Sequence, residues 1–362
     1  MHLWIDQTDP LQALLERRRG TRLFGVDTEF MRIDTFYPKL GLLQLRLGDE
    51  IALIDPVALP KLPGLAPLLA DPSNVIVMHS ASEDLEALAP CVPNGIGTLF
   101  DTQIAAAMTG FGFGLSYQKL VAAITGVDLP KAETRSDWLA RPLSAQQLDY
   151  AAQDVVHLST LYDELGRRLD QLGRRAWLAE DCTRLLEKAR SRDIDPQPQR
   201  GFRNAAEWPR EQQARLRKLL LWRDTTARRI DKPRPWLIDD ARISEFTLRP
   251  PRDIDELAQR TKGLRALRAA QRDALLEALR QPLEPDDFVF EPIIASPGPA
   301  QKRALSAMKD SVNALASELD LPDGLLCARR HLEMYVFDER WPSGLDGWRK
   351  PLLEELLAPL LP

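Results

Sequence analysis

The sequence predicts an α/β domain over roughly the first 170 residues, followed by two small all-α modules. At about 150 residues per domain, a chain of 362 residues is expected to form two or three domains. Short apolar runs alternate with helical patterns up to about residue 165, which is typical of an α/β domain. Strand signals nearly disappear after residue 171. The composition, 44% hydrophobic and 28% charged, is that of a folded protein.

The first domain is expected to contain four short strands interleaved with helices. Apolar runs predict strands at Leu23–Asp27, Leu42–Leu47, Ile51–Asp55 and Val75–His79. Helical patterns follow at Ser82–Leu88, with Ser82 as N-cap, at Thr102–Met108 and at Tyr117–Ile124. Ser144 is expected to cap the last helix, whose apolar face comprises Leu148, Ala151, Ala152, Val155 and Leu158.

The second half reads as helices in series. We expect them at Arg174–Arg190, Glu211–Ile230, Ile254–Thr261, Gly263–Leu279, Gln301–Leu319, Asp323–Phe337 and Trp348–Leu361. Five prolines between Pro282 and Pro299 indicate a linker that separates two helical modules.

Several classes of protein are disfavoured. The three cysteines, Cys91, Cys182 and Cys327, form no CxxC pair, so we expect plain thiols in a reducing compartment. The first 20 residues lack the pattern of a signal peptide, and no run reaches the ~20 apolar residues of a membrane helix. A cytoplasmic location is therefore expected.

The net charge of −5 hides an asymmetry along the chain. Residues 1–170 carry 14 basic and 22 acidic side chains, whereas residues 171–290 carry 26 and 20. Eight of the bases lie within 20 residues, beside Trp222 and Trp236: Arg215, Arg217, Lys218, Arg223, Arg228, Arg229, Lys232 and Arg234. Such a cluster can bind phosphates without sequence specificity, although arginine-rich helices are also often plain solvated surfaces.

Two acids stand at the end of the first predicted strand, in Val26–Phe30 (VDTEF). Alternation along a strand places Asp27 and Glu29 on one face, within reach of one hard cation. Alone, such a pair is more often an exposed pair of acids. Asp84 lies about one turn into the helix after the VIVMH strand, and the spacing of Tyr150 and Asp154 puts both on one helical face.

Together, four acids near the ends of their elements can hold two divalent ions roughly 4 Å apart, the arrangement used for in-line displacement at phosphorus. Oxygen ligands alone favour Mg²⁺ or Mn²⁺ over zinc. A nearby tyrosine, Tyr150, can orient or deprotonate the attacking water.

The three motifs resemble, in order and spacing, those of the DEDD 3'-5' exonucleases, in the branch that carries a tyrosine. They are VDTEF, then HSASEDLEAL at 79–88, and LDYAAQDV at 148–155. The segments FYPKLGLLQL and IALIDP resemble the bacterial ribonuclease D family within that group. The basic helical segment resembles the HRDC module of that family, and the last segment looks like a divergent second copy.

The resemblance implies a role for each motif residue. Asp27 would bridge two metal ions (Mg²⁺ or Mn²⁺), Glu29 and Asp154 would complete the site of the ion that activates water, and Asp84 would hold the second ion. Tyr150 would position the water. Phe30 would pack against the terminal base, although it can equally be a core residue. Four further residues match family positions near the nucleotide, and each can instead be structural: His79, Lys131, Trp138 and Arg141.

The resemblance also implies a domain plan and a reaction. It predicts a ribonuclease H-like exonuclease domain at 1–170 with a mixed sheet flanked by helices, a helical linker at 171–205, an HRDC domain at 206–283, a linker at 284–299 and a second HRDC-like domain at 300–362. The expected reaction is hydrolysis of 3'-terminal phosphodiesters of structured RNA that has a single-stranded 3' end, such as transfer-RNA precursors, by a monomer that releases nucleoside 5'-monophosphates. Three alternatives remain: a DNA exonuclease on the same fold, a non-catalytic RNA-binding protein with a remnant site, and an interaction scaffold built on the helical modules.

Overall fold

The computed structural model describes residues 2–129, 136–191 and 193–362, and the chain divides into two compact units. The first unit comprises residues 1–31, 39–191 and 299–362. The second comprises residues 32–38 and 192–298. We describe each unit by itself.

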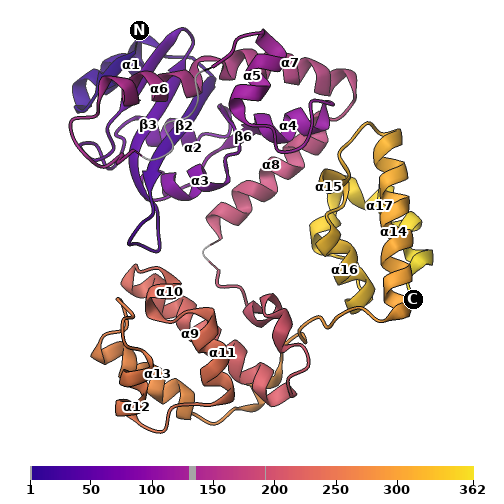
Figure 1. The fold of residues 1–362 in the computed structure, drawn as a ribbon. Coiled ribbons are helices and arrows are strands. Elements are labelled where there is room, and N and C mark those ends of the chain that lie inside the picture. Colours follow the sequence, from indigo (N-terminus) through magenta and orange to yellow (C-terminus); the bar gives the residue numbers. More distant parts are fainter. Residues whose placement is uncertain (1, 130–135, 192) are drawn as a thin grey trace. The chain divides into compact units, whose positions relative to one another are not determined.

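A mixed six-stranded sheet organises the first unit (Figure 1). Its strands are β1 (Leu3–Ile5), β2 (Leu23–Met31), β3 (Lys39–Leu47), β4 (Glu50–Ile54), β5 (Val75–Met78) and β6 (Thr98–Asp101), in the order β1-β4-β3-β2-β5-β6. β2, β3 and β4 are antiparallel neighbours, whereas β1, β5 and β6 add in parallel. All four predicted strands are present, and the expected mixed sheet with flanking helices is confirmed.

Helices cover the sheet. Those before residue 192 are α1 (Thr8–Arg17), α2 (Leu65–Ala70), α3 (Ser82–Leu88), α4 (Thr102–Met108), α5 (Tyr117–Thr125), α6 (Ala145–Val156), α7 (Leu158–Gln171) and α8 (Arg175–Arg190). α6 lies against β2, β3 and β4, and α7 lies against β2 and β5. Ser144 caps α6 as predicted, in a capping box with Gln147. Ser82 does not act as the cap of α3, because Ala81 occupies that position.

The C-terminal helices belong to the same unit as the sheet. They are α14 (Pro299–Glu318), α15 (Asp323–Leu326), α16 (Arg329–Asp338) and α17 (Lys350–Leu357), with short 3-10 turns at Ser343–Leu345, Gly347–Arg349 and Ala358–Leu360. Trp348 stacks on Trp177 of α8 with ring centroids 4.4 Å apart, and Arg349 forms two hydrogen bonds, of 2.6 and 2.8 Å, to Asp181 of α8. This segment was expected to form a domain of its own; it shares an apolar core with the sheet and its helices.

The second unit is helical, as expected. It contains α9 (Arg210–Ile230), α10 (Arg234–Leu237), α11 (Asp240–Leu248), α12 (Ile254–Arg260) and α13 (Ala269–Arg280), with 3-10 turns at Pro198–Gly201, Arg203–Ala205 and Pro285–Phe288. Its core includes Leu216, Leu220, Phe246 and Leu275. Residues 32–38 belong to this unit because the Asp231 carboxylate accepts hydrogen bonds from the backbone N–H groups of Phe36 and Tyr37, at 2.9 and 3.0 Å.

Two predicted helices differ from the structure. The helix expected over Gly263–Leu279 begins only at Ala269. The helix expected over Asp323–Phe337 is split by Cys327, whose extended backbone ends α15. All three cysteines are free and buried. None of the helices in the described ranges combines the length and apolar composition that crossing a bilayer requires.

Candidate active site

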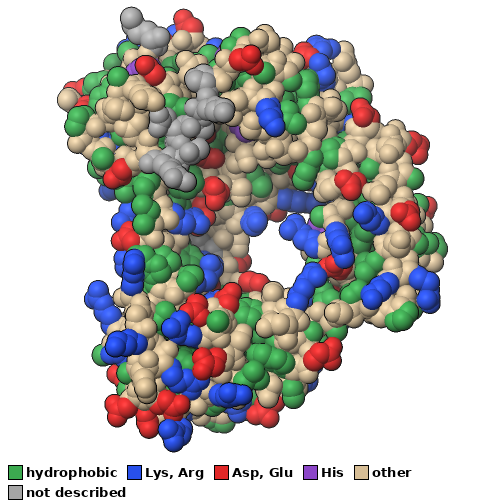
Figure 2. All heavy atoms as spheres, in the orientation of Figure 1, with side chains coloured by type: hydrophobic (Ala, Val, Ile, Leu, Met, Phe, Trp, Pro, Cys, Tyr) green, Lys and Arg blue, Asp and Glu red, His purple; other side chains and the backbone are tan. Residues whose placement is uncertain are grey.

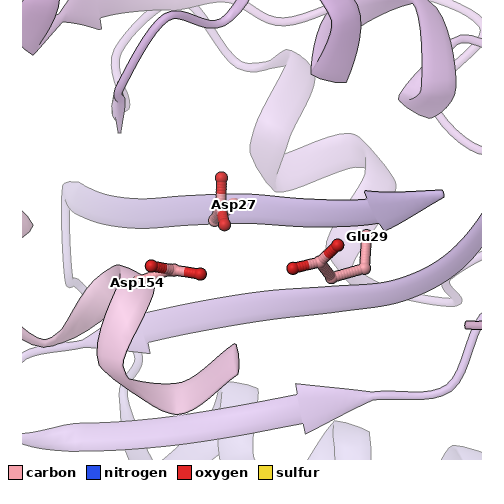
Figure 3. Close-up of side chains that lie close together, drawn as sticks. All are labelled: Asp27, Glu29 and Asp154. Carbon is pink, nitrogen blue, oxygen red and sulfur yellow. The ribbon is translucent and has the colours of Figure 1, made fainter. Parts of the chain in front are cut away.

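Asp27 and Glu29 lie on β2 and point to the same face of the sheet. Strand alternation places them there, with Thr28 on the opposite face. One oxygen of each carboxylate and one of Asp154 all lie within 4.8 Å of one another. Figure 3 shows Asp154, from α6, and Glu29, from β2, pointing toward each other beside Asp27. The structure thus brings together three of the four predicted acids at one point.

α6 presents Asp154 together with Tyr150, one turn earlier. The Tyr150 hydroxyl is close enough to the Asp154 carboxyl to lower its pKa by hydrogen bonding. The end of α6 is fixed by Tyr117, whose hydroxyl donates to the Gln153 carbonyl at 3.2 Å and accepts from the His157 N–H at 3.1 Å. The helix is therefore anchored at both ends, by the Ser144 cap and by Tyr117, on either side of its site residues.

Asp84, the fourth acid, comes from α3 and is buried, with 8% of its surface exposed. The Thr28 hydroxyl, between the two acids of β2, donates to its carboxylate. Asp84 lies outside the group of three whose oxygens fall within 4.8 Å, yet it is close enough to raise the pKa values of Asp27 and Glu29.

The four acids repel one another in a desolvated site. Burial raises the pKa of Asp27 well above its usual value, and the carboxylates of Asp84, Asp154 and Glu29 raise it further. Burial and the same kind of repulsion raise the pKa of Glu29 to about 8. Burial also raises the pKa of Asp154 to about 7 and that of Asp84 to about 6, although hydrogen bonds from Tyr150 and Thr28 act in the opposite direction.

This cluster fits a hard divalent cation. Among the described residues, the charged groups that act most strongly on Asp27, Glu29 and Asp154 are other carboxylates, and no basic side chain is among the main influences on their pKa values. Carboxylate oxygens without thiolate or imidazole are the ligand set that Mg²⁺ and Mn²⁺ prefer. The site is therefore an acidic cluster suited to metal binding.

Two of the other predicted residues lie beside the cluster. Phe30 follows Glu29 on β2, at a point where the pairing register with β3 shifts, and it is half-buried. Trp138 is buried, with 4% exposure, and its ring centroid lies 6.3 Å from that of Tyr150. Contact of either residue with a nucleotide stays a prediction.

His79 and Arg141 are engaged within the protein. The His79 ring nitrogens contact the Thr102 hydroxyl at 2.9 Å and the Leu115 carbonyl at 3.0 Å. Arg141 forms hydrogen bonds of 2.8 and 2.6 Å to the two oxygens of Asp55, and further bonds to backbone carbonyls. Both therefore have a structural role that is visible in the fold, and a role with substrate stays a prediction. Lys131 lies outside the described residues.

Asp101 is a supporting residue that the sequence reasoning missed. Its carboxylate, at the end of β6, accepts hydrogen bonds from the N–H groups of Ser80 and Ala81 and also caps α4. It thereby fixes the backbone where α3, the helix of Asp84, begins. An aspartate directly before the predicted helix at Thr102 is a sequence signal for the cap of α4. The bonds of Asp101 to Ser80 and Ala81 could not be predicted in the same way, because they depend on the pairing of β5 with β6.

The basic cluster of the second unit is largely paired with acids. Six of its eight cations form ion pairs with carboxylates: Arg215, Lys218, Arg223, Arg228, Lys232 and Arg234. A seventh, Arg217, donates to the Pro196 carbonyl. Figure 2 shows Lys and Arg side chains intermixed with Asp and Glu over this unit, at the lower left. Most of these cations would have to leave a carboxylate to bind a phosphate.

Comparison with known proteins places this fold and site. Residues 3–170 match the family described as 3'-5' exonuclease. The chain is 42% identical over 358 residues to ribonuclease D of Xanthomonas oryzae pv. oryzae, and the match covers 99% of this chain and 98% of the relative. It is 34% identical to ribonuclease D of Shewanella sp. (strain ANA-3), and that match covers 99% of this chain and 93% of the relative. The crystal structure of Escherichia coli RNase D, described as an exoribonuclease involved in structured RNA processing, superposes with a TM-score of 0.83 at 28% identity, covering 99% of this chain and 98% of that one. The chain belongs to the ribonuclease D family and is a 3'-5' exoribonuclease.

Proposed function

We propose that this exoribonuclease removes nucleotides one at a time from the single-stranded 3' end of structured RNA, with transfer-RNA precursors as the substrate class, and releases nucleoside 5'-monophosphates as a monomer. The observation that carries the proposal is the convergence of Asp27, Glu29 and Asp154, whose carboxylate oxygens lie within 4.8 Å of one another, with Asp84 close enough to raise the pKa values of Asp27 and Glu29. Such a cluster is costly to bury unless a bound cation neutralises it.

Asp27, Glu29, Asp84 and Asp154 are the residues that would hold two divalent ions, Mg²⁺ or Mn²⁺. When bound, such ions lower the pKa of a coordinated water and stabilise the charge that develops on the leaving oxygen. The chain's own contribution is to fix the carboxylates on two rigid elements, β2 and α6, and on the anchored start of α3.

Tyr150 has the role of positioning the attacking water. Burial, together with the Asp154 and Glu29 carboxylates, raises the pKa of its hydroxyl above the usual value, so the phenol stays neutral at physiological pH. A neutral hydroxyl that donates its proton to Asp154 keeps its oxygen lone pairs free to accept a hydrogen bond from water. This favours orientation of the water over its deprotonation by Tyr150.

Phe30 would pack against the terminal base; it follows Glu29 on the strand that carries two of the acids. A base held against this ring puts the last phosphodiester, rather than an internal one, beside the carboxylates. The same placement requires a free 3' end. We retain Trp138 and Lys131 as further candidates for contact with the nucleotide, and His79 and Arg141 as weaker ones because their polar groups are already engaged.

A time course with 5'-labelled RNA tests the proposal. The substrate is a hairpin with a single-stranded 3' tail, incubated with the full chain and either Mg²⁺, Mn²⁺ or EDTA. We expect a ladder that shortens from the 3' end and stops at the hairpin, nucleoside 5'-monophosphates as the product, and no shortening in EDTA. The same RNA with a 3'-terminal phosphate is the control and should resist.

Two of the alternatives have their own outcomes in this experiment. Equal turnover of a single-stranded DNA of the same sequence would favour the DNA exonuclease, because the metal-binding carboxylates do not distinguish the 2'-hydroxyl. Retained binding without shortening, with either metal, would refute the proposal and favour a non-catalytic RNA-binding protein.

A further inference from the structure

Gln44 lies in the middle of β3, on the face of the sheet that carries the acidic cluster. In the antiparallel register it stands opposite Asp27 on β2 and opposite Leu53 on β4. Residues that stand opposite each other in an antiparallel pair share a face, with Cβ atoms about 4.5–5.5 Å apart. The side chain of Gln44 is therefore a direct neighbour of the Asp27 side chain.

The Gln44 amide is buried without a hydrogen-bond partner. Its exposure is 0%, and neither its side-chain nitrogen nor its oxygen has a partner among the described residues. Its surroundings on this face are apolar: Leu42, Leu53, Ala151 and Ala152 form one buried cluster. An amide in such a place destabilises the fold, since it loses its bonds to water and gains none.

An apolar side chain of the same size would suit this position better if packing were its only task. Gln44 brings one thing that leucine or methionine lacks, an N–H donor beside Asp27. Carboxylates that bind metals are commonly held by hydrogen bonds from neighbouring groups, which fix their orientation. The final torsion of a glutamine side chain is broad, so its amide can turn toward a neighbouring carboxylate at little cost.

We propose that Gln44 is a positioning residue for Asp27: its amide N–H donates to the Asp27 carboxylate and holds that side chain in the orientation that binds metal. This inference rests on the proposed function, because it assigns Gln44 to the metal site formed by the acidic cluster. Within the described ranges, Asp27 has no other side-chain donor among the main influences on its pKa, and the hydrogen bond recorded there comes from the backbone N–H of Thr28.

Gln44→Met keeps the length of the side chain and removes its polar atoms. The proposal predicts that this substitution weakens metal binding without lowering thermal stability. Thermal unfolding of the full chain in EDTA should occur at the same temperature or higher, because the one bond to Asp27 leaves the rest of the amide without partners in an apolar site. The dissociation constant for Mn²⁺, measured by the paramagnetic resonance of free Mn²⁺, should rise by about 10–100-fold. kcat at limiting Mn²⁺ should fall, and added Mn²⁺ should restore it, while KM for RNA stays unchanged.

Leu42→Met is the matched control, on the same strand and the same face and equally buried. It should leave Mn²⁺ binding unchanged. Gln44→Leu provides a second variant without the donor should Gln44→Met fold poorly, and it should weaken Mn²⁺ binding to the same degree.

The outcomes separate the inference from the proposed function. Lower thermal stability of both Gln44 variants, with Mn²⁺ binding as tight as in the wild type, would overturn the positioning role and make Gln44 a packing residue. A wild-type chain that shortens RNA without binding Mn²⁺ or Mg²⁺ would overturn the proposed metal site, and the inference with it. A wild type that binds Mn²⁺, beside Gln44 variants that bind it ten times more weakly at equal stability, supports both.

Discussion

The acids of the first unit and the bases of the second unit are accommodated in opposite ways. Asp27, Glu29 and Asp154 lie together, and the charged groups that act most strongly on them are other carboxylates. In the second unit, the single carboxylate of Asp224 pairs with two arginines, Arg228 and Arg234. One region concentrates charge of a single sign, and the other neutralises most of its charge locally.

This difference shows that the number of charged residues in a segment does not indicate which of them are available to bind a ligand. Residues 1–170 and 171–290 carry excesses of similar size and opposite sign. In the described part of the chain, the acids of the site are few and form no ion pair, whereas most of the cations in the basic cluster have partners. Chemistry is expected where the charge lacks a partner, because there a ligand gains the most by binding.

Replacement of one unpaired acid gives the largest expected effect. Asp154→Asn should lower turnover of 3'-tailed RNA about 10³-fold or more, because loss of a metal ligand removes several kcal/mol of transition-state stabilisation. At pH 8 in EDTA its unfolding temperature should rise, since one member of a repelling group is gone. Asp149→Asn, an exposed acid on the same helix, is the control and should change neither quantity. Normal turnover by Asp154→Asn would refute the unpaired-acid account.

The core of the site could be predicted from sequence because its residues lie in short local patterns. Asp27 and Glu29 belong to one strand, and strand alternation alone puts them on one face. Tyr150 and Asp154 belong to one helix, and their spacing alone aligns them. The convergence of β2, α3 and α6 on one point was inferred from the combination of motifs, and the fold that supports it is confirmed by the structural likeness to ribonuclease D.

What the sequence did not reveal depends on pairing between distant segments. β1 has three residues, too few for a periodic signal, and adds in parallel to β4, which is remote in the chain. β6 has only two apolar residues, Leu99 and Phe100, and becomes recognisable as a strand through its parallel pairing with β5. Gln44 looks like one polar residue in an apolar strand until the register sets it opposite Asp27. The ion pairs of Lys218 with Asp287 and of Lys232 with Asp34 likewise join residues far apart in the chain.

The pH dependence of stability gives a second, smaller test of the unpaired acids. Carboxyls with raised pKa values hold more protons in the folded state than in the unfolded chain, where pKa values are about 4. Between pH 5 and 9, stability of the metal-free protein should therefore be greatest at the acidic end and fall as pH rises through about 6, 7 and 8, the pKa values of Asp84, Asp154 and Glu29. Unfolding temperatures measured in EDTA from pH 5 to 9 check this. Mg²⁺ should restore stability at the alkaline end, and Asp154→Asn should flatten the curve. A curve that rises from pH 6 to 8 would contradict the raised pKa values.

The salt dependence of RNA binding gives the smallest expected effect and tests the paired bases. For single strands, the slope of log K against log salt changes by about 0.7 per phosphate contact. Arg229 is exposed, and no ion pair is recorded for it in the described part of the chain. Arg229→Met should therefore reduce the slope by about 0.7 at most, with a loss of affinity of a few-fold.

Lys218→Met is the matched control, because Lys218 is bound to Asp287 at 3.0 Å and to the Pro282 carbonyl at 3.2 Å. Its slope should equal that of the wild type, since a cation already held by a carboxylate releases no counterion from RNA. An equal reduction in both variants would mean that the ion pairs of the second unit open when RNA binds, and the contrast between the two regions would then hold only for the free protein.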